Sequence, residues 1–145
     1  MKANELKLSD LMVEDWVVCY HPTSQKSFEK VSVGLLHTMQ EQEYGHINEN
    51  SPLFRIVEPI PLTPEILKKN GFVNSYIDVN LNKDSVYKYN HFYTGNSVIV
   101  DMESNKLIVK YENNIWMNLP YSRTIYVHEL QHVLKHCDIK KEIII

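Results

Sequence analysis

The chain has 145 residues with a formal net charge of −3 at pH 7, and 43% of its residues are apolar and 23% charged. This composition is typical of a globular protein, and the length suits one domain or two small ones. Residues 1–60 hold nine acidic and five basic side chains, so the charge argues against a basic nucleic-acid-binding surface there.

The N-terminal segment M-K-A-N-E-L-K-L-S-D lacks the apolar centre of a secretory signal peptide, and no apolar run approaches the ~20 residues of a membrane-spanning helix. We therefore expect a cytoplasmic protein with no membrane partner. The two cysteines, Cys19 and Cys137, match no metal-binding or redox spacing and stand among apolar residues. The sequence predicts that they are buried free thiols, with a disulfide as the alternative.

Short β-like segments joined by polar turns fill residues 1–60. Residues 15–20 form a β-branched and aromatic run, and residues 28–36 begin with alternating apolar and polar side chains. Residues 44–47 and 53–57 are shorter candidates. Four or five short strands in this span indicate a small SH3-like β-barrel over residues 1–60, and a plain β-meander would give the same pattern.

A proline-rich connector and a short helix follow. The segment E-P-I-P-L, residues 58–62, predicts an extended backbone because each proline disfavours helix at the residue before it. Thr63 can cap a helix that begins at Pro64, and Gly71 can end it in the left-handed conformation. We place the domain boundary near residue 60, so that a second domain covers residues 61–145.

The second domain is expected to contain an antiparallel sheet and a helix. The expected strands are residues 76–81, 86–92, 97–102, 106–111 and 115–119, with 142–145 as a further candidate. The last helix is expected over residues 125–137. The fold class is therefore α+β: a small SH3-like β-barrel followed by an antiparallel sheet with a packed C-terminal helix.

This last helix contains His128-Glu129-Leu130-Gln131-His132, the H-E-x-x-H spacing of zinc hydrolases. In such a site the two histidines bind the metal, and the glutamate polarises a metal-bound water. On a helical wheel at about 100° per residue, His128 and His132 lie opposite an apolar face. The pattern indicates either a zinc site or an exposed polar stripe on a docking helix.

A third metal ligand has no motif in the sequence, although catalytic zinc needs one. In an extended zinc-peptidase pattern, H-E-x-x-H-x-x-G-x-x-H, Lys135 stands at the glycine and Asp138 at the last histidine. Without that glycine we expect no reason for the helix to break and turn Asp138 toward a metal. His91 and His46 are upstream alternatives. The sequence therefore assigns no catalytic, cofactor-binding or metal residue.

Two further sets of aromatic side chains are candidates for binding. Tyr87, Tyr89, Phe92 and Tyr93 could stack on a base or a carbohydrate. Their alternating strand spacing instead favours core and cross-strand packing. Trp16 is expected in the core of the first domain, with a peptide-binding anchor as the alternative.

The segment E-P-I-P-L-T-P-E-I-L-K-K-N-G-F, residues 58–72, closely resembles E-P-I-P-L-T-E-E-W-L-L-K-F-G-F, a signature of short bacterial and phage (mobile-element) proteins. In that family a β-rich region follows and ends in V-H-Q-L-Q-N, which V-H-E-L-Q-H at residues 127–132 resembles. Glu129 and His132 stand where the family has glutamine and asparagine. The resemblance therefore implies that the zinc motif is specific to this sequence, and it brings no established activity.

These observations together predict a non-enzymatic binding or accessory module with a protein or peptide partner and no cofactor. The alternative is a zinc-dependent hydrolase with His128 and His132 as ligands and Glu129 as base. A nucleic-acid-binding module is a second alternative, which the charge disfavours.

Overall fold

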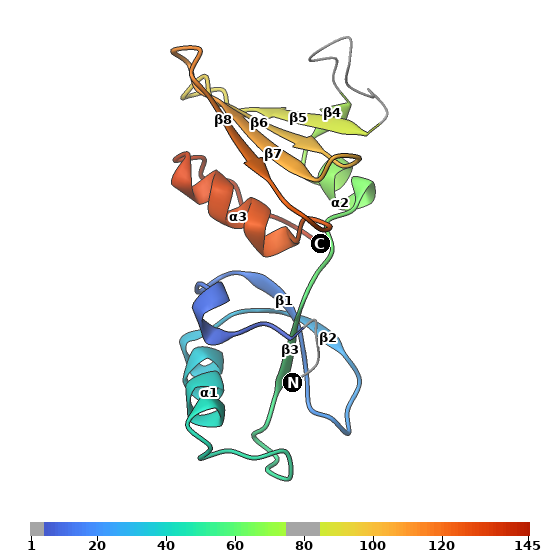
Figure 1. Cartoon of the computed structure of the whole chain (residues 1–145), viewed down its shortest axis with the longest axis vertical. Coiled ribbons are helices and arrows are strands. Elements are labelled where there is room, and N and C mark those ends of the chain that lie inside the picture. The colour runs from blue at the N-terminus through green and yellow to red at the C-terminus, as the bar shows by residue number, and fades with distance from the viewer. Residues whose placement is uncertain (1–4, 75–84) are drawn as a thin grey trace. The chain divides into compact units, whose positions relative to one another are not determined.

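The computed structural model describes residues 5–74 and 85–145 of the chain. The chain divides into two compact units, Met1–Ile60 and Pro61–Ile145 (Figure 1). The division falls within the proline-rich connector at residues 58–62. Two antiparallel sheets and a C-terminal helix make the fold mixed α+β, which confirms the predicted class.

The first unit contains one small sheet with strand order β2-β1-β3, and both strand pairs are antiparallel. Its elements are a 3-10 helix Leu8–Asp10, β1 Trp16–Tyr20, β2 Ser27–Lys30, α1 Val33–Glu43 and β3 Ile56–Pro59. The sheet is open, with β2 and β3 at its edges. The SH3-like barrel expected over residues 1–60 is therefore not found in the described part of this unit.

Strand β2 covers only the first residues of the strand expected over 28–36, helix α1 begins within that range, and a turn after α1 takes the place of the strand expected over 44–47. Strand β2 ends at Lys30, and the Ser32 side chain then accepts a hydrogen bond from the Leu35 N–H (3.1 Å), which caps the helix. Met39 is the one fully buried residue of α1, and Leu35 and Leu36 pack beside it only partly buried, so the apolar stripe of the helix is short. The prediction was wrong because the strand-like alternation continued across the cap and no helical periodicity followed it.

The core of the first unit gathers around the inward side chains of β1. Val17 and Cys19 point into this core, and Met39 from α1 and Val57 from β3 lie beside them. Trp16 lies on the other side of β1 and is only half-buried, and the Lys30 ammonium lies 5.4 Å from the centre of its ring. The expectation that Trp16 belongs to this core is therefore not met.

The second unit contains a sheet with strand order β4-β5-β6-β7-β8, every neighbouring pair antiparallel. Its elements are α2 Pro64–Lys69, β4 Val73–Asn74, β5 Val86–Asn90, β6 Ser97–Asp101, β7 Lys106–Lys110, β8 Trp116–Pro120 and α3 Val127–His136. Four of the expected strands are confirmed. The one predicted at residues 76–81 lies outside the described residues.

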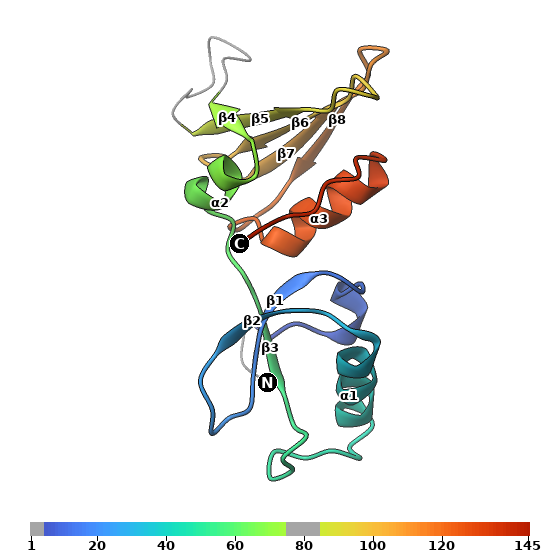
Figure 2. The ribbon, with the colours of Figure 1, turned by 180° about the vertical axis from the view of Figure 1, so that it is seen from behind.

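Helix α3 lies along one face of this sheet (Figures 1 and 2). Every residue of β6 is buried, and β7 buries Leu107 and Val109 on alternate positions. Leu130 and Leu134 of α3 are buried as well. The second unit therefore has an apolar core of its own, as expected for a helix packed on an antiparallel sheet.

The helix predicted to begin at Pro64 is confirmed, together with the residues expected at its two ends. The Thr63 side chain accepts a hydrogen bond from the Ile66 N–H (3.2 Å), Pro64 is the first residue of α2, and Gly71 has φ +83°. Local chemistry at both ends of this helix was therefore sufficient to locate it.

The strand expected at residues 142–145 is wrong, and a side chain occupies the place of a strand partner. The Asn70 amide donates to the Ile144 carbonyl (2.7 Å) and accepts from the Ile144 N–H (2.8 Å). It also donates to the Ile66 carbonyl (2.8 Å) at the end of α2. One buried amide thus satisfies the backbone of the C-terminal segment without a strand.

Candidate functional site

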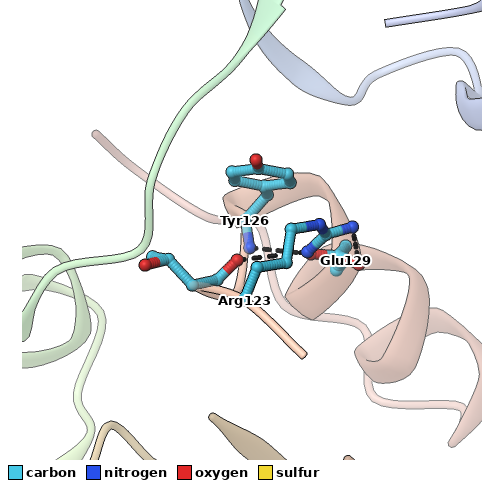
Figure 3. A network of polar contacts seen from close by, with 4 residues as sticks. Arg123, Tyr126 and Glu129 are labelled. Atoms are coloured by element: carbon cyan, nitrogen blue, oxygen red, sulfur yellow. Dashed lines mark hydrogen bonds and ion pairs between the residues drawn. The ribbon is translucent and has the colours of Figure 1, made fainter. Parts of the chain in front are cut away.

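The H-E-x-x-H motif lies at the start of α3, where its glutamate closes the first turn. The Glu129 carboxylate accepts a hydrogen bond from the Tyr126 N–H (2.9 Å), which places Glu129 at the third helical position of a capping box. The same carboxylate accepts a hydrogen bond from each of the two terminal guanidinium nitrogens of Arg123, at 2.8 and 3.1 Å (Figure 3). Arg123 also lies 4.2 Å from the centre of the Tyr126 ring.

These contacts use the carboxylate that a zinc hydrolase would need for its water. The Glu129 side chain is 12% exposed, and the hydrogen bond to it raises the pKa of Arg123. A two-bond arginine–carboxylate pair is geometrically specific and fixes the orientation of both groups. Glu129 therefore stabilises the helix N-terminus in this structure.

The histidines of α3 differ from the expected exposed stripe. His128 is 5% exposed, His132 is half-buried and His136 is exposed. The His128 ring stacks on the Tyr126 ring with centroids 5.8 Å apart, and its centroid is 5.6 Å from that of His132. The prediction of an exposed His128 is wrong because a helical wheel gives directions around the axis and not the neighbouring rings that cover a side chain.

The residues considered as a third ligand lie elsewhere. Nδ1 of His46 is 2.9 Å from the Glu41 carboxylate in the first unit, and Nδ1 of His91 is 2.8 Å from the Thr94 hydroxyl in the β5–β6 hairpin. Across residues 5–74 and 85–145, no three His, Cys, Asp or Glu side chains are grouped so that they could hold a metal ion.

Helix α3 ends without the glycine of the zinc-peptidase pattern. Asp138 adopts φ +56°, and its N–H donates to the Lys135 carbonyl (3.1 Å). The Ile139 N–H donates to the Leu134 carbonyl (2.9 Å), which completes a Schellman motif with both apolar side chains buried. The helix ends one residue before the predicted residue 137, and Asp138 adopts the left-handed conformation that glycine often takes at a helix end.

The aromatic run of the second unit divides into a packed part and an exposed part. Tyr87 is buried, and the Tyr89 ring lies 5.4 Å from the Phe72 ring, so both pack as predicted. Phe92 and Tyr93 are 91% and 89% exposed at the tip of the β5–β6 hairpin. The core prediction is therefore wrong for these two, because they follow the end of β5 and fall within the turn.

A second hairpin tip lies beside the first. The register aligns Asn90, Ser97, Lys110 and Trp116 across four neighbouring strands, so the β5–β6 and β7–β8 turns are at the same end of the sheet. The β7–β8 tip exposes Ile115 (59%) and Trp116 (49%). We call Phe92, Tyr93, Ile115 and Trp116 the hairpin-tip surface.

Polar contacts hold the two tips together. The side-chain oxygen Oδ1 of Asn96 accepts a hydrogen bond from the Glu112 N–H (3.1 Å), which joins one turn to the other. Gly95 has φ +68°, and a Cβ atom there would lie 3.3 Å from the Glu112 side chain, so the turns approach closely. The tip backbones are therefore fixed relative to each other while their apolar side chains remain exposed.

A groove of about 450 Å³ lies within the first unit. Apolar side chains such as Met39 and Phe54 line it together with Glu43, Glu49 and Arg55. Its charges have both signs, and the Arg55 guanidinium is held by the Pro52 and Phe54 carbonyls (2.8 and 2.9 Å). Nothing in this mixed lining selects one class of ligand.

The two cysteines are free and buried, which confirms the predicted thiols. Burial, with a smaller effect of Glu29, raises the pKa of the Cys19 thiol from 9.0 to about 12. Burial also raises the pKa of Cys137, although its hydrogen bond with Tyr111 acts in the opposite direction. Because the thiolate is the nucleophile, neither cysteine is poised for catalysis at neutral pH.

Comparison of the chain with protein-family models, curated proteins and solved structures gave no match. Among the described residues, no helix has both the length and the apolar character needed to cross a membrane. Function is therefore inferred from the residues of the chain and their geometry.

Proposed function

We propose that the protein is a non-enzymatic binding module that docks a protein partner through the hairpin-tip surface. The observation that carries this proposal is the exposure of Phe92, Tyr93, Ile115 and Trp116 on two joined turns. Large aromatic and aliphatic side chains are costly to leave in water, and contiguous exposed groups of them mark interaction sites.

The chemistry of these side chains suits a protein interface. Tryptophan and tyrosine are enriched among the residues that dominate binding energy, because they bury a large area with few rotatable bonds. The hydrogen bond between Asn96 and Glu112 holds the tips in place before binding, so less conformational entropy is lost on docking. The Lys110 ammonium lies 5.2 Å from the Trp116 ring centre and adds a polar rim.

The test uses a protein partner captured from host cells and then purified. Phe92→Ser with Tyr93→Ser should weaken its affinity by at least about tenfold, the usual scale for removing an aromatic anchor. Phe28→Ser is the matched control, since Phe28 is also exposed (63%) but belongs to the first unit. Equal affinity of the tip variant and the wild type for every purified partner would contradict the proposal.

We also infer membership in the bacterial and phage (mobile-element) protein family that residues 58–72 and 127–132 resemble. The support is the length of the shared E-P-I-P-L-T segment and the V-H-x-L-Q match.

Zinc hydrolysis is supported less well, because Glu129 is already bound by Arg123 and Tyr126. Metal analysis of protein purified without a histidine tag should find no stoichiometric zinc. One tightly bound zinc that is lost in His132→Asn, together with a hydrolytic activity, would support the zinc site instead.

A further inference from the structure

Strand β8 is an edge strand of the second sheet, and its register shows which backbone groups face away from β7. The Tyr111 N–H donates to the Ile115 carbonyl (2.9 Å), and the Tyr121 N–H donates to the Asn105 carbonyl (2.8 Å). Both pairs continue the β7–β8 register. In an antiparallel ladder every second residue of a strand bonds the same neighbour. Met117 and Leu119, in phase with Ile115 and Tyr121, therefore bond β7.

The alternate residues of β8 direct their backbone groups outward. These residues are Trp116, Asn118 and Pro120, and all three side chains are exposed. The outer edge thus offers two N–H donors, because proline has none, and three carbonyl acceptors. No strand pairs with this edge within the described residues.

This edge has no charged side chain to oppose pairing with another strand, and Pro120 at its end is the one residue of β8 that limits pairing. Residues 115–120 read I-W-M-N-L-P and contain no charged side chain. By contrast, the edge strand β2 of the first unit carries Glu29 and Lys30. Charged residues on edge strands normally prevent association, and an uncharged apolar edge permits it.

We propose that β8 pairs with β8 of a second copy of this chain, antiparallel about a two-fold axis at Asn118. In this arrangement the two Asn118 residues exchange both backbone hydrogen bonds. The Trp116 N–H donates to the carbonyl of the partner's Pro120. Pro120 has no N–H to donate in return, so this pair of residues forms one backbone hydrogen bond instead of two. Two five-stranded sheets would join into one.

The strand is complementary to its own antiparallel copy in its side chains as well. Trp116 lies opposite the partner's Pro120 on one face, and Met117 lies opposite the partner's Leu119 on the other. In this pairing Asn118 faces its own copy at the axis, so a charge at that position would face a like charge. The absence of charge from β8 removes this repulsion and favours a second copy over an unrelated peptide.

The experiment is sedimentation velocity of the full chain over a range of concentrations. The wild type should reach twice the chain mass of 17.1 kDa. Asn118→Lys places two ammonium groups at the axis and should raise the dimer dissociation constant by about tenfold or more. Asn118→Thr, the matched control, keeps the N–H and adds no charge, so it should remain dimeric.

A second variant tests the backbone bonds directly. Asn118→Pro removes an N–H that faces away from β7, so it should abolish the dimer while the β7–β8 ladder stays intact. A wild type that is monomeric at every concentration would overturn the proposal, and so would an Asn118→Lys variant that dimerises like the wild type. A monomer that binds an extended peptide along β8 would also overturn it. Phe92→Ser with Tyr93→Ser should leave the dimer unchanged, which separates this proposal from the proposed function.

Discussion

Glu129 accepts hydrogen bonds from both terminal guanidinium nitrogens of Arg123, at 2.8 and 3.1 Å. This pair links the first turn of α3 to the segment before the helix. Glu129→Gln should therefore lower the free energy of unfolding by about 1–2 kcal/mol, because it removes a charged acceptor from a capping box. Urea unfolding of Glu129→Gln, Arg123→Gln and the double variant measures the coupling. Arg123 is 47% exposed, so we expect a coupling of about 0.5–1 kcal/mol. Additive effects of the two changes would contradict the structural role of the pair.

Cys19 should make the protein less stable at alkaline pH. Its pKa is about 12 in the folded chain and 9.0 in the unfolded reference, so the folded state holds the proton more tightly. This stabilisation is complete below pH 9.0 and decreases as the pH rises toward 12, because only the unfolded state then releases the proton. Urea unfolding at pH about 8 and about 10.5 should show a smaller loss of stability in Cys19→Ala than in the wild type. Equal losses would show that Cys19 does not titrate as described.

Asn70 should be essential for the attachment of the C-terminal segment. Its amide satisfies the Ile66 carbonyl and both backbone groups of Ile144. Asn70→Ala leaves these groups without that partner, so it should cost about 1–3 kcal/mol. Amide hydrogen exchange at Ile144 should become faster in this variant. Asn70→Asp is the control that keeps the acceptor for the Ile144 N–H but loses the donors, so its Ile144 exchange should stay closer to that of the wild type.

Two phenylalanines separate the fold from the proposed binding surface. Phe72 is 1% exposed and Phe92 is 91% exposed. Phe72→Ala should cost about 3–5 kcal/mol, because it opens a cavity beside Tyr89. Phe92→Ala should change the free energy of unfolding by no more than about 0.5 kcal/mol. Thermal unfolding of both variants measures this difference, and a large loss in Phe92→Ala would mean that the hairpin tip is structural.

The sequence predicted the second unit better than the first. The alternation of side chains along a strand and the caps of α2 both depend on residues close in the sequence. Strands such as β6 and β7 and the helix at Pro64 could therefore be predicted from the sequence. Helix α1 was missed because it has only one buried residue, Met39, and its cap at Ser32 stands inside a strand-like run. A helix with so short an apolar stripe cannot be recognised from its periodicity, even though Ser32 caps it well.

The candidate sites show the same limit. The sequence by itself determined the α+β class, the buried thiols and the H-E-x-x-H spacing, since each depends on composition or on residues close along the chain. Only the tertiary structure decided that Glu129 binds Arg123, that a hydrogen bond between Asn96 and Glu112 joins the two hairpin turns, and that β8 forms an open edge. These relationships depend on which strands become neighbours and on which groups a folded backbone brings within hydrogen-bonding distance. Local periodicity contains no information on either.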